Sequence, residues 1–154
     1  MKPAWQACLV LSGCAALAAG LLHIGIIFGG PAWFRFFGAP RHIIRMAAAG
    51  HWYPTAVCLA VAAVLLVCAA YAFSGAGLLR RLPFLRLALA LIGSVLFLRG
   101  LVFLPMMLLA PSSMARITSS TGIDLFLVVT SFLCMAMGLA YLVAFLKLSP
   151  QRKD

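Results

Sequence analysis

Three ionisable side chains lie inside apolar stretches of the sequence and away from its basic turns: His23, Arg99 and Asp124. Such groups are costly to place in an apolar helix, so each is a candidate for a special role. An ion pair between Arg99 and Asp124 would offset much of the cost of a guanidinium in a low-dielectric setting, and His23 could hydrogen-bond to either member. This cluster would either fix the register of the helices or line a pocket for an anionic group. In a third interpretation, Arg99 has no partner and extends toward lipid headgroups.

The positions of these three groups along the chain place them at a similar height. His23 follows Trp5 by 18 residues, which is ~27 Å of helix. Arg99 follows Pro83 by 16 residues, or ~24 Å, and Asp124 opens the last apolar run. The connection between the first two apolar runs supplies further polar groups at this level: Arg41, His42, Arg45 and His51. A pocket built from these residues would bind an anionic lipid headgroup or a small acid.

Other kinds of site find little support in the sequence. Asp124 and Asp154 are the only acidic residues, which excludes paired-carboxylate catalysis and carboxylate metal sites. The five cysteines lie in apolar runs without a C-x-x-C motif, so we expect free thiols and no zinc site. His23 with His51 is the one histidine pair at matching height that haem could use. Because no nucleotide loop or serine-nucleophile motif is present either, we expect no catalytic residues, no metal and no cofactor.

The composition indicates what class of protein carries these residues. Of the 154 residues, 66% are hydrophobic and 9% are charged, whereas soluble chains are about half apolar and about a quarter charged. Four apolar runs, about residues 5–28, 53–73, 84–109 and 123–148, are each long enough to cross a hydrocarbon core of ~30 Å. The sequence therefore predicts an all-α integral membrane protein: a four-transmembrane-helix bundle that forms a single domain over residues 1–154. Its short loops make sequential helices antiparallel neighbours.

The connection over residues 29–52 is the longest and the richest in aromatic residues. Gly29, Gly30 and Pro31 favour an end to the first helix there. Residues 41–49 then combine apolar and basic side chains in the manner of a short amphipathic helix that lies in the membrane interface. The aromatic rings before it would face the acyl chains, and the guanidinium groups would face phosphates. The simpler alternative is an aromatic-belt loop without a ligand of its own.

The net charge of +10 reflects twelve Lys and Arg against two Asp. No basic stretch is long or interleaved with exposed aromatic residues, so we expect no nucleic-acid partner. With four spans, the termini share a side with the second loop, and that side carries seven basic residues: Lys2, Arg80, Arg81, Arg86, Lys147, Arg152 and Lys153. The opposite side carries four: Arg35, Arg41, Arg45 and Arg116. This bias predicts that both termini are cytoplasmic and that the aromatic loop lies outside.

Small residues recur at a spacing of four in two of the apolar runs. The first run carries Ser12, Ala16 and Gly20, followed by Gly25 and Gly29, and the fourth run carries Ala136, Ala140 and Ala144. This spacing places each set on one helix face, where the missing side-chain bulk lets two backbones approach closely. We expect these faces to pack within the bundle, and a homodimer surface is the alternative.

Short motifs over residues 20 to 105 resemble a group of short four-span bacterial inner-membrane proteins of unknown function. The motifs are Phe36-Phe37-Gly38-Ala39, Trp52-Tyr53-Pro54-Thr55, Ser74-Gly75-Ala76-Gly77, Leu82-Pro83 and Leu98-Arg99-Gly100. The resemblance implies the four-span topology and the bacterial inner membrane, but no activity. Acidic residues often follow the first motif in that group, whereas this chain has Pro40-Arg41-His42.

The sequence favours a protein that works through its surfaces over one that catalyses a reaction. We expect an accessory or assembly subunit, or a lipid-associated bundle, whose partners are the bilayer, anionic headgroups and a second copy or another membrane protein. Two alternatives stay open. One is a small transporter or channel component, which a continuous polar path would favour. The other is a membrane enzyme acting on a lipid or quinone, which a closed pocket containing His23 would favour.

Overall fold

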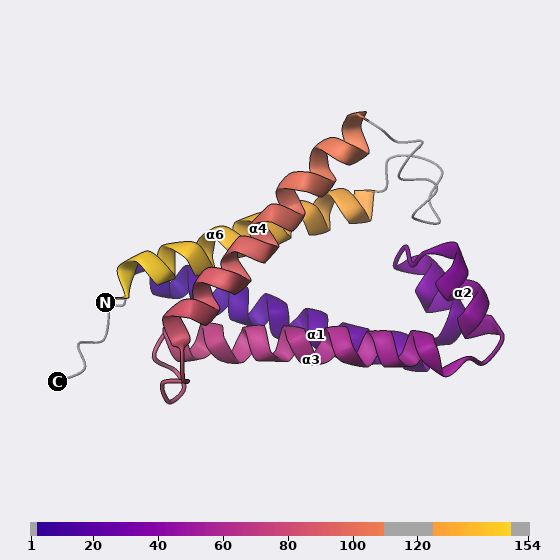
Figure 1. Cartoon of the computed structure of the whole chain (residues 1–154), viewed down its shortest axis with the longest axis horizontal. Coiled ribbons are helices and arrows are strands. Elements are labelled where there is room, and N and C mark those ends of the chain that lie inside the picture. The colour runs from indigo at the N-terminus through magenta and orange to yellow at the C-terminus, as the bar shows by residue number, and fades with distance from the viewer. Residues whose placement is uncertain (1–2, 110–124, 149–154) are drawn as a thin grey trace.

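The computed structural model describes residues 3–109 and 125–148, and every regular element in these ranges is an α-helix. The helices are α1 (Ala4–Phe36), α2 (Arg41–Ala48), α3 (Trp52–Gly75), α4 (Leu85–Leu109) and α6 (Leu125–Lys147) (Figure 1). All of them except α2 are long and apolar enough to cross a membrane. The expectation of an all-helical chain with four apolar spans is therefore confirmed for the described residues.

Helix α1 runs further than the sequence predicts. Its backbone leaves the helical conformation at Gly30, where φ is 64° and ψ is −158°, and then resumes through Phe36. Glycine tolerates this left-handed φ, and Pro31 is suited to the first position of the helical turn that follows. The three residues that we expected to end the first helix therefore make a kink, and a last helical segment, residues 31–36, continues beyond it.

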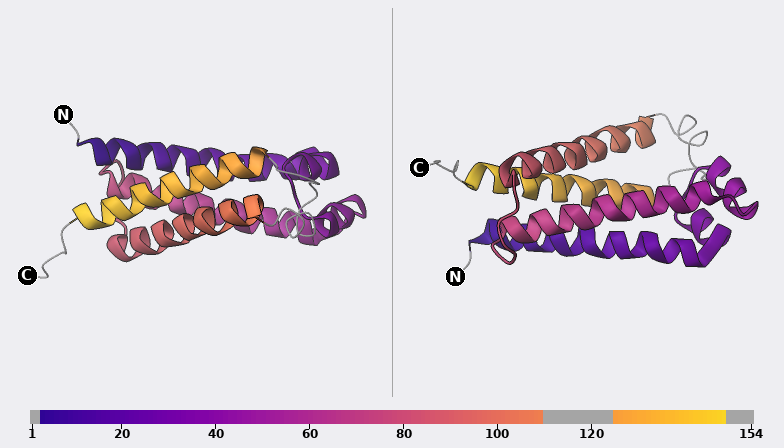
Figure 2. Two further views of the ribbon diagram at one scale, coloured as in Figure 1. Left: turned by 90° about the horizontal axis from the view of Figure 1, so that it is seen from above. Right: turned by 60° about the horizontal axis from the view of Figure 1, so that its bottom comes forward.

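The four long helices form two antiparallel pairs. Helix α1 packs against α3, and α4 packs against α6 (Figures 1 and 2). The pairs meet at the end where α1 begins and α6 ends, and α4 diverges from α1 and α3 toward the other end. There the short helix α2 packs on α1 and α3.

Glycines bring α4 and α6 into backbone contact. A methyl group on Gly138 of α6 would lie 2.5 Å from the backbone nitrogen of Phe97 and 2.8 Å from the carbonyl oxygen of Gly93. A methyl group on Gly100 of α4 would lie 2.6 Å from the carbonyl oxygen of Ser131. These glycines are therefore needed for the close approach, although our sequence stripes did not include them.

The small residues of the α1 stripe do not all contact the same part of the molecule. Ser12, Ala16 and Gly20 are buried, and Gly20 lies against α3, where an added methyl group would meet the Ala62 carbonyl oxygen at 3.4 Å. Gly29 instead lies under the ring of Trp33, four residues further along the same helix. The expected packing face therefore ends before the kink.

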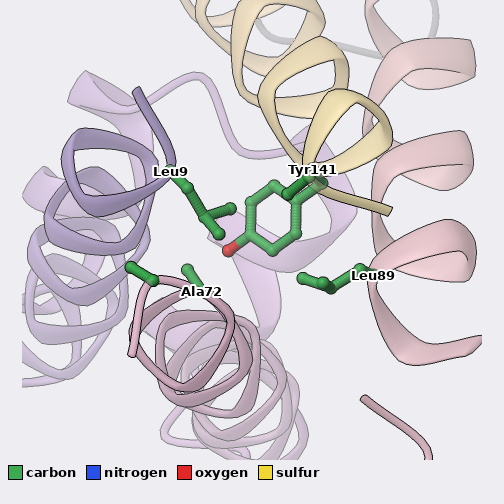
Figure 3. Close-up of a cluster of buried hydrophobic side chains, with 6 residues drawn as sticks. Leu9, Ala72, Leu89 and Tyr141 are labelled. Atoms are coloured by element: carbon green, nitrogen blue, oxygen red, sulfur yellow. The ribbon is translucent and has the colours of Figure 1, made fainter. Parts of the chain in front are cut away.

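Tyr141 of α6 lies between the two helix pairs at the joined end of the bundle, where all four long helices meet. Its side chain has no exposed surface and packs with Leu9 of α1, Ala72 of α3 and Leu89 of α4 (Figure 3). Its hydroxyl group donates a hydrogen bond of 2.8 Å to the Cys68 carbonyl oxygen. A buried hydroxyl needs such a partner, and this acceptor fixes α6 against α3.

The turn between α3 and α4 is held by Ser74. Its hydroxyl group donates to the Arg80 carbonyl oxygen at 3.0 Å and accepts the Leu82 backbone N–H at 3.0 Å. These two bonds satisfy backbone groups that lie outside any helix. The turn consequently presents Arg80 and Arg81 on the surface, where both are exposed.

Replacement of Gly138 tests the contact between α4 and α6. We expect Gly138→Ala to lower the free energy of unfolding by ~1–3 kcal/mol, because backbone atoms of α4 leave no room for the methyl group. Gly25→Ala is the matched control, since its methyl group would meet Trp33 only at 3.7 Å and alanine favours a helix by ~1 kcal/mol. Both values can be measured by unfolding in mixed detergent micelles. Equal stability of the two variants would contradict the contact.

Replacement of Tyr141 separates its hydrogen bond from its packing. Tyr141→Phe should cost ~0.5–1.5 kcal/mol through loss of the bond to Cys68, and Tyr141→Ala should cost ~3–5 kcal/mol because a cavity forms as well. Tyr71→Phe is the control, since that hydroxyl group makes a longer bond of 3.2 Å to the Pro83 carbonyl oxygen in an exposed setting. The same unfolding measurement applies, and a Tyr71 effect as large as that of Tyr141→Phe would argue against the central role of Tyr141.

Candidate functional site: the basic and aromatic end of the bundle

Helix α2 is anchored by one face. Ile44 is buried in a cluster with Ile26 of α1, Phe34 of the segment after the kink and Cys58 of α3. Ile43 and Ala47 pack against the same cluster. The apolar side of α2 is therefore taken up by the protein itself.

The opposite face of α2 is basic and accessible. Arg41, His42 and Arg45 are exposed, as are Arg35 before the helix and His51 after it. The structure thus places three of the predicted site residues on one side of a short helix, because positions 41, 42 and 45 share a helix face, and a fourth, His51, follows that helix. Among the described residues, no acidic side chain lies in this region of the chain.

Exposed aromatic side chains precede and follow this basic helix in the chain. Phe36 is 78% exposed and Trp52 is 74% exposed, while Trp33 and Tyr53 are 44% exposed each. The rings of Trp33 and Phe36 both contact that of Phe37, with centroids 5.9 and 5.0 Å apart, respectively. Rings with a polar edge favour the membrane–water boundary. Basic and aromatic side chains at one end of a helical bundle are the composition expected at that boundary.

The kink in α1 sets the position of Trp33. The Trp33 ring covers Gly29, where any β-carbon would overlap the indole. The sequence signal for this arrangement is the Gly29-Gly30-Pro31 run followed by tryptophan. We interpreted the glycine as part of a packing stripe and the run as a helix end, and both interpretations missed this use.

His23 bonds within its own helix. Its Nδ1 atom lies 2.8 Å from the Ala19 carbonyl oxygen, and the side chain is half-buried. Because a carbonyl oxygen only accepts, Nδ1 carries the hydrogen in this bond, and Nε2 of the neutral ring is then an acceptor. The imidazole therefore offers one ring nitrogen to any further partner.

Arg99 stands apart from the basic face of α2. It projects from α4 as an exposed side chain, donates a hydrogen bond of 2.7 Å to the Cys134 sulfur and lies over the Phe103 ring at 5.6 Å. Helix α4 pairs with α6, whereas α2 packs on α1 and α3. Asp124, the expected partner of Arg99, lies outside the described residues. The pairing, and its link to His23, therefore stays a prediction.

Arg86 is a polar residue whose setting the sequence did not reveal. We counted it with the basic residues on the side of the termini, yet its Nε atom is buried and has no hydrogen-bond partner in the described part of the chain. Its guanidinium carbon lies over the Phe145 ring at 5.0 Å. The one sequence signal for this buried setting was the position of Arg86 inside the third apolar run.

No group of three His, Cys, Asp or Glu side chains in residues 3–109 and 125–148 is arranged to hold a metal ion. Within those ranges, the structure defines a small helical membrane protein with four apolar spans and one basic, aromatic end. Comparisons of the chain with protein families, with curated proteins and with solved structures find no match. The functional argument therefore rests on the residues themselves.

Replacement of Gly29 tests the position of Trp33. In a background with Trp5→Phe and Trp52→Phe, we expect Gly29→Ala to displace the indole and to increase quenching of Trp33 fluorescence by aqueous acrylamide. Gly25→Ala, with ordinary contact to the same ring at 3.7 Å, should leave quenching unchanged. Identical quenching in both variants would show that the ring does not rest on Gly29.

A double-mutant cycle tests the predicted pair between Arg99 and Asp124. If the side chains interact, the effects of Arg99→Gln and Asp124→Asn on the free energy of unfolding should be coupled by at least ~1 kcal/mol, because contacting residues are not additive. Arg99→Gln with Cys134→Ala provides a cycle for a contact that the structure contains. Additivity within ~0.3 kcal/mol in the first cycle would refute the pair.

Proposed function

We propose that this chain is a non-enzymatic bacterial inner-membrane protein, an accessory or lipid-associated bundle whose α2 end binds anionic headgroups. The observation that carries the proposal is the division of α2, whose Ile44 is buried against the bundle while Arg41 and Arg45 on the other side are exposed. A helix held in this way presents its guanidinium groups without needing to insert its own apolar face.

Electrostatics favour a phosphate-bearing partner at this surface. Each Lys or Arg near an anionic membrane surface contributes ~1 kcal/mol, and arginine can bind phosphate through two parallel hydrogen bonds. Arg35, at the end of α1, adds a third guanidinium group near the same end. The exposed rings of Phe36 and Trp52 would hold this end at headgroup depth.

The proposal includes an orientation. Both termini would be cytoplasmic and α2 would lie on the outer side, following the bias of seven basic residues against four. The arrangement of the helices supports a shared side for the two ends, because α1 begins and α6 ends at the same end of the bundle (Figure 2). A cysteine placed at Ser119 should then be labelled only from the outer side, and labelling from the cytoplasm would reverse the orientation.

Quenching of Trp52 fluorescence by brominated lipids tests whether the α2 end binds anionic headgroups. In a background with Trp5→Phe and Trp33→Phe, we would reconstitute the protein in phosphatidylcholine and titrate brominated phosphatidylglycerol, whose bromine atoms quench nearby tryptophan. We expect brominated phosphatidylglycerol to quench Trp52 at a lower mole fraction than brominated phosphatidylcholine does. This selectivity for the anionic lipid should weaken at high salt. Arg41→Gln together with Arg45→Gln should reduce the selectivity by up to roughly thirtyfold.

The matched control is the pair Arg80→Gln and Arg81→Gln, which removes two exposed guanidinium groups at the other end of the bundle. It should leave quenching of Trp52 unchanged. If the Arg41 and Arg45 variant keeps the selectivity of the parent protein, the α2 end does not recognise anionic headgroups. Competition by a soluble carboxylate, without selectivity for the lipid, would instead assign the surface to a small acid.

A further inference from the structure

A shallow hollow of about 180 Å³ lies between α1 and α6, at the end of the bundle opposite α2. Its lining is apolar apart from one thiol and consists of Trp5, Cys8, Ala136, Leu139, Ala140 and Val143. The hollow exists because α6 has small side chains at positions 136 and 140. These two belong to a stripe that we expected to pack inside the bundle, yet Ala136 is exposed, whereas Ala144 is completely buried.

The basic side chain of Lys147 lies one helical turn beyond the hollow. Lys147 is exposed and follows Val143 by four residues, so both side chains lie on the same face of α6, about 6 Å apart along the axis. Trp5, in the first turn of α1, borders the hollow at the same end. The hollow is therefore bordered at this end by a tryptophan in its lining and by a lysine one turn beyond it, which are side chains typical of headgroup depth.

The lining fits a flexible chain better than a second helix. Helices that dimerise through small residues use several of them at a spacing of four, so that the two backbones approach closely along one face. Here Ala144, the third alanine of the stripe, is buried inside the bundle, so only Ala136 and Ala140 line the hollow, next to the 54% exposed Leu139. The lining of α6 also extends only from residue 136 to residue 143, about two helical turns.

We propose that this hollow binds one acyl chain of an anionic phospholipid whose phosphate pairs with Lys147. Charge complementarity selects the headgroup, and the gap left by the alanines admits the chain. The site is independent of the headgroup surface proposed for α2, because the two lie at opposite ends of the bundle. Together they would place specific lipids in both leaflets.

Trp5 provides a direct reporter of this site. In a background with Trp33→Phe and Trp52→Phe, brominated phosphatidylglycerol should quench Trp5 at a lower mole fraction than brominated phosphatidylcholine does. Lys147→Gln should reduce that selectivity roughly fivefold, whereas Lys147→Arg should preserve it. Ala140→Leu should fill the hollow and lower quenching by both lipids, and Ala63→Leu, at an exposed position of α3, is the control for added bulk.

Each outcome decides the proposal. Equal quenching by the two lipids, or selectivity that Lys147→Gln leaves intact, would overturn it. Disulfide formation between two copies through Cys8, in a background with the other four cysteines replaced by alanine, together with protection of Trp5 from both lipids, would assign the hollow to a second copy. Because Trp52 reports the α2 end and Trp5 reports this hollow, failure of one proposal leaves the other measurable.

Discussion

The hydrogen bond from Tyr141 to the Cys68 carbonyl oxygen joins the two helix pairs at the end of the bundle where they meet. In a bilayer, helices gain little by burying apolar surface against one another, because lipid tails are equally apolar. Association then depends on close packing and on polar contacts such as this one. Helix α6 contacts α1 of the other pair as well as its own partner α4. The second contact between the pairs, that of α3 with α4, is less extensive than that of α1 with α6. Tyr141 consequently lies on the helix that links the pairs, within a cluster to which all four spans contribute.

The two pairs meet at one end only, and this gives the molecule two chemically different ends. At the joined end, the Ser74 hydrogen bonds hold a basic turn, and the guanidinium of Arg86 lies over Phe145. At the other end, α4 diverges and α2 packs on α1 and α3. Helix α2 leaves its basic side free because its apolar side is already covered by the bundle. Both ends therefore carry cations next to apolar surface.

The apolar runs of this sequence are enough to predict its spans, because the need to satisfy backbone hydrogen bonds in lipid leaves helices as the solution for each run. Helices α3 and α4 begin and end within two residues of the predicted runs. The amphipathic segment beginning at Arg41 is likewise a local pattern, and it forms α2. The sequence also predicts the basic residues of α2, because they belong to the same local pattern.

The sequence does not predict which helix faces contact one another, and only the tertiary structure shows these contacts. Gly29 and Gly20 carry the same local signal, yet one lies under Trp33 and the other against α3. Ala136 and Ala144 likewise share one stripe, and only Ala144 is buried. A small side chain permits close approach without specifying what approaches, so the spacing of four could not distinguish a neighbouring helix, a ring or a lipid. The sequence by itself determined the number of spans and the location of the charges. Which faces meet, and which stay open to lipid, was decided by how the two pairs pack, because side-chain shape is matched only when the helices are brought together.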